Sequence, residues 1–240
     1  MLSELLLQFK NDISLFNLFE YLTFKTAISA ITALIISFII GPLTIKKLQQ
    51  YQIGEEIRSN GPESHLAKRG TPTMGGVIII LSTLLPTLLF SDLSNIMVII
   101  IALSTLWMGV IGFIDDYLKI IIKAKDGMIA RYKMIGQILL GVIISYAIIN
   151  SNDFNGFNTK TTIPFFKNFE FDFGIFYPLL VILVITATSN AVNLTDGLDG
   201  LAIGLLAICF TVFTAISYIS GRVDFSDYLN ILYPVSYTHL

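Results

Sequence analysis

Six apolar runs constrain the fold of this chain more than any other feature of its sequence. They cover residues 24–45, 75–90, 96–114, 134–149, 175–190 and 201–219. A helix needs about 20 apolar residues to cross the hydrocarbon layer of a membrane. The runs do not alternate polar and apolar residues, as the strands of a membrane barrel do. We therefore predict an all-α fold, a polytopic membrane helix bundle with six transmembrane helices.

The composition agrees with a membrane protein and argues against several other classes. Charged residues make up 13% of the chain and hydrophobic residues 54%, whereas soluble proteins contain roughly 25% charged residues. The net charge of −2 gives no indication of a nucleic-acid partner. One cysteine and two distant histidines suggest neither a disulfide nor a metal cluster. We expect a single membrane domain over residues 1–240, with membrane lipids and no nucleic acid as partners.

The basic residues predict which loops face the cytoplasm. Ten of the fifteen lysines and arginines lie in two alternate loops, residues 46–74 and 115–133. Cytoplasmic loops of membrane proteins carry an excess of such residues. Both loops are therefore predicted to be cytoplasmic, with the N-terminus outside. Counting helices onward places the connection 190–200 on the same side.

The acidic pair Asp115–Asp116 directly follows the third apolar run. Two neighbouring carboxylates can hold Mg²⁺ together with substrate phosphates, or one of them can act as a base. A solvated helix end neutralised by Lys119 is the alternative, and the sequence leaves it open. Lys119 and Lys123 then lie four residues apart among isoleucines. This spacing predicts a short amphipathic stretch on the membrane surface, which would bind phosphate or serve as an anchor.

A second polar segment, HLAKRGTPTMGGVIII, covers residues 65–80. Its paired glycines, Gly75 and Gly76, precede a predicted helix, and Lys68 lies nearby. A helix N-terminus with free N–H groups can bind phosphate. Paired glycines equally suit close packing between helices.

A third polar segment, TSNAVNLTDGLDGLA, covers residues 188–202 and repeats a polar side chain every three positions: Asn190, Asn193, Asp196 and Asp199. One face of a helix cannot carry all four, because the set drifts around the helix axis. Gly197 and Gly200 therefore predict a break between two helices. Capping of the last helix by Asp199 would explain only one of the four residues.

The three segments are expected to meet at one membrane face. Carboxylates suited to a divalent metal and cations suited to phosphates favour phosphoryl-transfer chemistry. Transporters place ionisable residues near the middle of the bilayer, whereas these residues are predicted at one edge.

At this point three motifs resemble the phospho-N-acetylmuramoyl-pentapeptide-transferase family, within the polyprenyl-phosphate N-acetylhexosamine-1-phosphate transferases. They are GTPTMGG (70–76), FIDDYLK (113–119) and NAVNLTDGLDGLA (190–202), and the resemblance extends to about residue 233. It implies a ten-helix fold in the bacterial inner membrane with a cytoplasmic cleft. It also implies Mg²⁺-dependent transfer of phospho-N-acetylmuramoyl-pentapeptide from UDP-N-acetylmuramoyl-pentapeptide to undecaprenyl phosphate, which gives lipid I and UMP in peptidoglycan synthesis.

The resemblance also implies which residues form the site. Asp115 and Asp116 match the catalytic acidic pair, and they are expected to divide Mg²⁺ binding and the handling of the lipid phosphate between them. Eight further residues match polar substrate-binding positions: Lys68, Thr73, Lys119, Lys123, Asn190, Asn193, Asp196 and Asp199.

The C-terminal end departs from the family pattern. The family continues with further helices that carry another aspartate motif and a His-rich loop, whereas this chain ends in an atypical tail, residues 232–240. We therefore expect an N-terminal portion of the transferase that is inactive by itself. A homodimer is compatible with the sequence. The competing hypotheses are an N-acetylglucosamine-1-phosphate transferase of the same superfamily, a transporter or channel, and an inactive membrane fragment.

Overall fold

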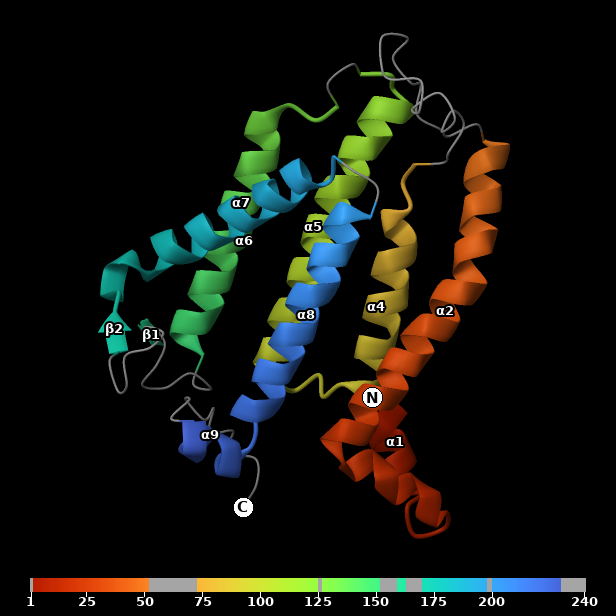
Figure 1. The fold of residues 1–240 in the computed structure, drawn as a ribbon, viewed down its shortest axis with the longest axis vertical. Coiled ribbons are helices and arrows are strands. Elements are labelled where there is room, and N and C mark those ends of the chain that lie inside the picture. Colours follow the sequence, from red (N-terminus) through yellow and green to blue (C-terminus); the bar gives the residue numbers. More distant parts are fainter. Residues whose placement is uncertain are drawn as a thin grey trace. The chain divides into compact units, whose positions relative to one another are not determined.

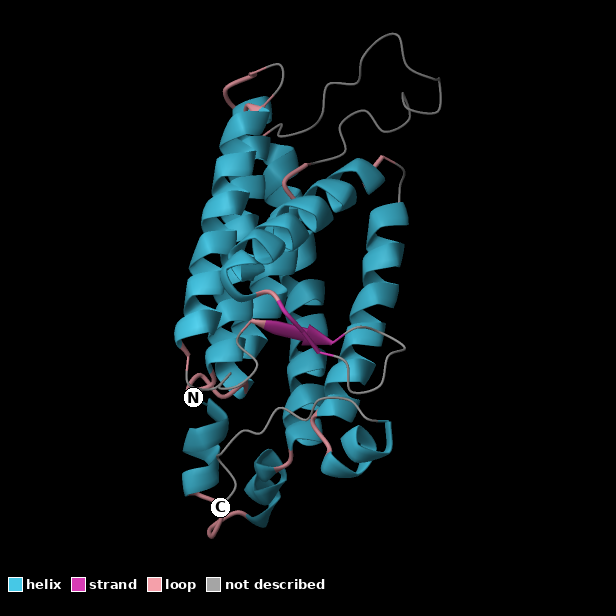
Figure 2. Cartoon of the chain, turned by 90° about the vertical axis from the view of Figure 1, so that its left-hand side faces the viewer, coloured by secondary structure: helices cyan, strands magenta, loops and turns pink. Residues whose placement is uncertain are grey.

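The structure, a computed structural model, describes residues 2–51, 73–124, 127–151, 159–162, 170–197 and 200–229. Figures 1 and 2 show that nearly all of this is helix. In chain order the elements are α1 (Leu2–Gln8), η1 (Ser14–Glu20), α2 (Leu22–Gln50), α4 (Gly76–Phe90), α5 (Ile96–Ile120), α6 (Ala130–Asn150), β1 (Lys160–Thr162), β2 (Glu170–Asp172), η3 (Gly174–Phe176), α7 (Tyr177–Thr195), α8 (Leu201–Ser220) and α9 (Val223–Leu229). The chain divides into two compact units, residues 1–136 and 137–240, and each is described by itself.

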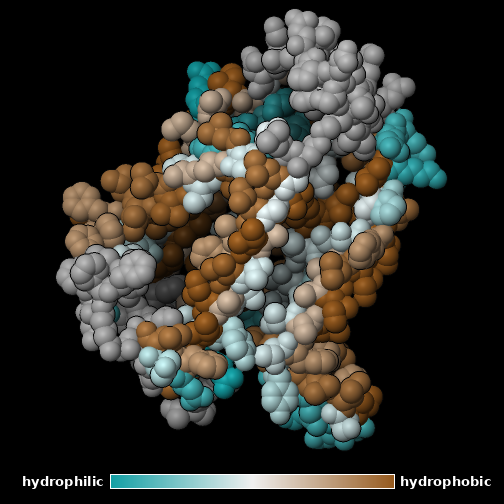
Figure 3. Space-filling model, viewed as in Figure 1, coloured by the Kyte–Doolittle hydropathy of each residue, from teal (hydrophilic) through white to brown (hydrophobic). Residues whose placement is uncertain are grey.

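The helices match the six apolar runs. Among the described residues, five helices are long and apolar enough to cross a membrane: α2, α5, α6, α7 together with η3, and α8. The sixth, α4, is equally apolar but has 15 residues. Large apolar side chains cover much of the surface in Figure 3, and hydrophilic residues gather at helix ends such as that of α2. Phe38 and Leu183, for example, are 78% and 61% exposed. This distribution suits a lipid environment, and the chain is a multi-pass membrane protein with an all-α bundle.

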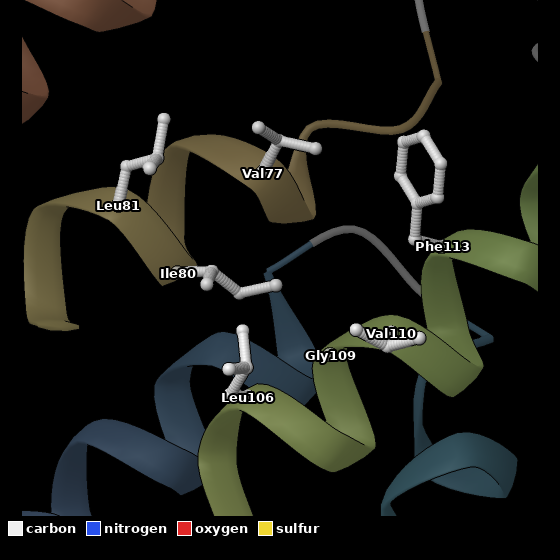
Figure 4. A pocket seen from close by; sticks show the side chains of 7 residues that line it. All are labelled: Val77, Ile80, Leu81, Leu106, Gly109, Val110 and Phe113. Carbon is white, nitrogen blue, oxygen red and sulfur yellow. The ribbon is translucent and has the colours of Figure 1, made fainter. Parts of the chain in front are cut away.

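In the first unit, α4 packs between α2 and α5 (Figure 1). The contact with α5 is close because Gly109 has no side chain: a Cβ at this position would collide with Ile80. Beside this contact an apolar groove of about 170 Å³ separates the two helices (Figure 4). Its lining residues are Val77, Ile80, Leu81, Leu106, Gly109, Val110 and Phe113. The groove therefore runs along α5 to within two residues of Asp115.

The N-terminal segment packs on the end of α4, an arrangement that the sequence analysis did not predict. Ser3 is buried, and its hydroxyl donates to the carbonyl oxygen of Phe90 (3.2 Å). The ring of Phe19 stacks on Phe90, with centroids 6.3 Å apart, and meets Phe24 edge-on at 5.1 Å. These contacts hold the segment at the end of α4 that is remote from Thr73.

In the second unit, a short hairpin precedes α7 (Figure 2). Strands β1 and β2 are antiparallel, with Thr161 opposite Phe171. The carboxylate of Asp172 accepts hydrogen bonds from the hydroxyl of Thr159 (2.5 Å) and from the amide of Gly174 (2.9 Å). The hairpin is the one feature of the described chain that lies outside the predicted all-α pattern.

Candidate active site

The carboxylate of Asp115 is the centre of a polar cluster in the first unit. Asp115 is only 7% exposed. Its Oδ2 atom accepts hydrogen bonds from the ammonium groups of Lys119 (2.8 Å) and Lys133 (2.7 Å). Its Oδ1 atom accepts one from the backbone amide of Met128 (2.8 Å). The predicted neighbour Lys119 is therefore in direct contact with Asp115, whereas Lys133 was expected only to mark a cytoplasmic loop.

The local sequence explains why these groups meet. The acidic pair was expected at a helix end, but α5 continues to Ile120. Asp115 and Lys119 therefore lie one helical turn apart on the same face. Lys133 lies in the first turn of α6, and the connection between the two helices brings it back to Asp115. The residues after Ile120 form a turn, so the predicted amphipathic stretch is partly helix end and partly turn.

Gly127 allows the connection to approach Asp115. Its φ angle is +66°, a left-handed conformation that side chains disfavour. A Cβ at Gly127 would lie 2.6 Å from both Asp115 Oδ1 and Lys119 Cε. The next residue, Met128, donates its amide to the same Oδ1 atom. The backbone at 127–128 thus forms one wall around the carboxylate.

The cluster carries a formal charge of +1, because one carboxylate faces two ammonium groups. Asp115 is buried, whereas the side chains of Lys119 and Lys133 are 46% and 25% exposed. A buried carboxylate is costly unless it is paired and hydrogen-bonded, as it is here. The surplus positive charge can attract an anionic group such as a phosphate. Asp116, the second acidic residue, follows Asp115 in the chain and is half-buried.

Lys123 ends the turn after α5 in an unusual conformation. Its φ angle is +57°, and the following amide, that of Ala124, donates to the carbonyl oxygen of Leu118 (3.0 Å). Glycine is the residue that normally adopts this geometry at a helix end. The side chain of Lys123 is exposed. The protein thus keeps a cation at a position where glycine would be less strained.

Replacing Lys123 by glycine should separate strain from function. We expect the protein to become more stable by about 1 kcal/mol, because the left-handed conformation no longer strains a side chain. If the cation binds substrate, the KM for the nucleotide substrate rises in the same variant. Thermal unfolding in detergent and steady-state kinetics measure the two effects.

The matched control is Lys123→Ala, which removes the cation and keeps the strained conformation. It should raise KM equally without the gain in stability. An unchanged KM in both variants would remove Lys123 from the candidate site.

Thr73 lies directly before α4, at the opposite end of that helix from Phe90. Its hydroxyl oxygen is buried and, among the described residues, has no hydrogen-bond partner. Such a group costs about 1–3 kcal/mol unless a partner satisfies it. Among the same residues, a Cβ at Gly75 or Gly76 would meet nothing within 4 Å. This leaves room before the start of α4, as the phosphate-binding hypothesis requires.

The second unit holds the described part of the Asn/Asp segment. Asn190 and Asn193 lie in the last two turns of α7, and Asp196 is its C-cap residue. All three are exposed. The predicted break is confirmed: α8 begins at Leu201, after Gly200 with a φ angle of +78°. Lys68 and Asp199 lie outside the described residues.

Comparison with known proteins shows the family of the chain. A family model described as Glycosyl transferase family 4 matches residues 98–236, more than half of the sequence. The chain belongs to this family. A shorter model, Phospho-N-acetylmuramoyl-pentapeptide-transferase signature 1, matches residues 68–80 of this chain. This range includes Lys68 and Thr73.

The relatives of this chain include proteins named phospho-N-acetylmuramoyl-pentapeptide-transferase. The protein from Pelobacter propionicus is 46% identical over 96% of the chain and 64% of its own length. Those from Desulforapulum autotrophicum and Citrifermentans bemidjiense are 45% and 46% identical, over 98% and 97% of the chain. The chain spans 65% and 64% of the length of these two relatives. The family resemblance predicted from the motifs is thus confirmed.

The described residues fit the magnesium ion implied by the resemblance only in part. No group of three or more metal-binding side chains occurs within the described ranges. Asp115 is a poor ligand, because two ammonium groups 2.7–2.8 Å from its Oδ2 atom would repel a dication. Asp116 supplies one carboxylate, which is sufficient where substrate phosphates complete the coordination.

Sequence reasoning missed three residues that shape these sites: Gly127, Lys133 and Gln137. The signal for Gly127 was a glycine in a predicted loop. The signal for Lys133 was a cation at the start of an apolar helix. The third residue, Gln137, is a polar side chain in an apolar run, and it contacts Asn190 across two helices.

Proposed function

We propose that this protein transfers phospho-N-acetylmuramoyl-pentapeptide from UDP-N-acetylmuramoyl-pentapeptide to undecaprenyl phosphate, giving lipid I and UMP. The observation that carries the proposal is the Asp115 cluster, with its surplus positive charge beside a second carboxylate. Two anionic reactants must approach each other in this reaction, so neutralisation of phosphate charge is the main task of the protein. The family, the signature at residues 68–80 and the names of the relatives support this choice of substrate.

The acidic pair divides its work in this proposal. Asp115 holds Lys119 and Lys133 in place, and their ammonium groups bind phosphate oxygens of the substrates. Asp116 would hold Mg²⁺, which supplies further neutralisation of the diphosphate when it is bound. Thr73 and Lys68, from the signature segment, contribute polar contacts to the nucleotide sugar. Asn190, Asn193, Asp196 and Asp199, from the third motif, serve the same reaction.

The proposed site faces the cytoplasm of a bacterial inner membrane. The excess of lysine and arginine in loops 46–74 and 115–133 supports this orientation, which leaves the N-terminus outside. The bacterial origin of the relatives supports the inner membrane. In this orientation the nucleotide sugar arrives from the cytosol and the lipid phosphate from the inner leaflet.

The test is an assay of the full-length protein in membrane vesicles with undecaprenyl phosphate and Mg²⁺. We expect UDP-N-acetylmuramoyl-pentapeptide to yield a labelled lipid product and UMP in equal amounts. UDP-N-acetylglucosamine, offered at the same concentration, should yield neither. A preference for UDP-N-acetylglucosamine would replace the proposed substrate with that of the related transferases, and inactivity with both would contradict the enzyme.

A further inference from the structure

Gln137 is a polar residue of the largely apolar helix α6, and its side chain reaches α7. Its side chain is only 3% exposed, although α6 is apolar enough to cross a membrane. A buried amide in such a helix is costly unless its hydrogen-bonding groups are satisfied. The buried amide of Gln137 therefore requires hydrogen-bond partners within the protein.

Both ends of the Gln137 amide contact successive residues of α7. Its Nε2 atom donates to the hydroxyl of Ser189 (3.0 Å), and its Oε1 atom accepts from Nδ2 of Asn190 (3.1 Å). Each end of the Gln137 amide thus has a partner, and its oxygen binds Asn190, one of the predicted substrate-binding residues.

The backbones of the two helices are also held close together one turn further along α6. A Cβ at Gly141 would lie 2.9 Å from the Cα atom of Ile182 in α7. Small residues at such positions let membrane helices approach closely. Gly141 and Gln137 are four residues apart and share one face of α6. The contact at Gly141 therefore sets the distance at which Gln137 reaches Ser189 and Asn190.

The hydrogen bonds of Asn190 determine which of its atoms can serve a ligand. Its Nδ2 atom donates to Gln137 Oε1 and also to the carbonyl oxygen of Thr186 (2.8 Å). An amide nitrogen has two hydrogens, so both are engaged. The remaining polar atom is the carbonyl oxygen Oδ1 of an exposed side chain. Asn190 can thus offer an acceptor, whereas a flipped amide would offer a donor.

We propose that Gln137 is a positioning residue, which fixes the amide of Asn190 so that its oxygen faces the substrate. Asn190 then accepts a hydrogen bond from a hydroxyl or N–H group of the nucleotide sugar and does not donate to a phosphate. The substrate part of this inference rests on the proposed function. The orientation of Asn190 is a property of the chain alone.

The first experiment measures the orientation directly, without substrate. The protein is labelled with ¹⁵N-asparagine in lipid nanodiscs, and the side-chain amide signals of Asn190 are identified by their loss in Asn190→Ala. Both hydrogens should be protected from exchange with water in the unmodified protein. In Gln137→Met, which keeps an apolar side chain of similar length, one of them should exchange at least about tenfold faster.

The matched control is Ser189→Ala, which removes the other hydrogen bond of Gln137 and leaves its contact with Asn190. It should leave the Asn190 signals protected. Unprotected Asn190 signals in the unmodified protein would overturn the inference, even if Gln137→Met failed to fold. Equal effects of Gln137→Met and Ser189→Ala would also overturn it, because they would indicate a general loosening of the helix contact.

The second experiment uses kinetics of the full-length protein. Gln137→Met should raise the KM for the nucleotide sugar about tenfold and change kcat less. Added to Asn190→Ala, it should have no further effect, because Gln137 acts through Asn190. Additive effects would contradict the inference. Protected Asn190 signals with an unchanged KM in both single variants would instead contradict the proposed role of Asn190 and leave its orientation established.

Discussion

Replacing Asp116 by asparagine is expected to lower kcat by about a hundred- to thousandfold, while the protein still inserts and folds. Asp116 directly follows Asp115, the centre of a cluster with a charge of +1, and supplies the negative charge proposed to hold Mg²⁺. Asparagine keeps the size of the side chain and removes that charge. Turnover in vesicles and thermal unfolding in detergent measure activity and folding separately.

Asp115→Asn should cause a similar loss of turnover and, in contrast, a loss of stability. Its Oδ2 atom separates two ammonium groups that would otherwise repel each other. The lysine side chains are 46% and 25% exposed, so the pairs are only partly buried and the loss is expected to be about 1–3 kcal/mol. Near-normal turnover in both aspartate variants would contradict the assignment of the acidic pair. A stable but inactive Asp115→Asn protein would contradict its structural role.

Asp92→Asn is the matched control. Asp92 lies before α5, at the opposite end of that helix from Asp115. The hydroxyl and the amide of Ser94 donate to its carboxylate at 2.6 and 2.9 Å, and these bonds hold the pKa of Asp92 below its ordinary value. It is therefore a charged aspartate in the same unit, outside the candidate site. Its replacement should leave turnover unchanged.

Gly127→Ala is expected to have the second large effect. The added Cβ would overlap Asp115 Oδ1 and Lys119 Cε, both 2.6 Å away. It would also place a side chain on a residue with a φ angle of +66°, which costs about 1–2 kcal/mol. The backbone at Gly127 and Met128 must move, and the carboxylate of Asp115 and its two lysines are expected to move with it. A displacement of about 1 Å in such a site can lower turnover about a hundredfold.

Gly174→Ala separates the two causes. Gly174 has a φ angle of +48°, and among the described residues a Cβ there would meet nothing within 4 Å. This variant should lose similar stability from backbone strain and keep its turnover. If Gly127→Ala and Gly174→Ala lowered turnover equally, strain alone would explain the loss, and the contact with Asp115 would not matter for activity.

Much of the fold could be predicted because each membrane helix corresponds to a local run of apolar residues in the sequence. The apolar run 96–114 predicted α5, and the drift of polar residues around Gly197 and Gly200 predicted the break before α8. The ends of the helices were predicted less accurately. An acidic pair need not end a helix: α5 continues past Asp115 to Ile120, and Lys119, one turn later, pairs with its carboxylate.

The hairpin of β1 and β2 and the packing of α1 and η1 were not predicted. Three-residue strands are too short to show alternation. The contacts of Ser3 and Phe19 with Phe90 join residues more than seventy positions apart. Such contacts depend on how α4 returns to the N-terminal segment, and no local pattern contains that information.

The sequence by itself determined the membrane class, the helices and the identity of the motif residues, because hydrophobicity and motif spacing are local properties of the chain. Only the tertiary structure decided that Asp115 binds Lys119 and Lys133 under a wall formed by Gly127, and that Gln137 holds the amide of Asn190. Hydrogen bonds act over about 3 Å. The partners of a side chain therefore follow from the packing of elements that are distant in sequence.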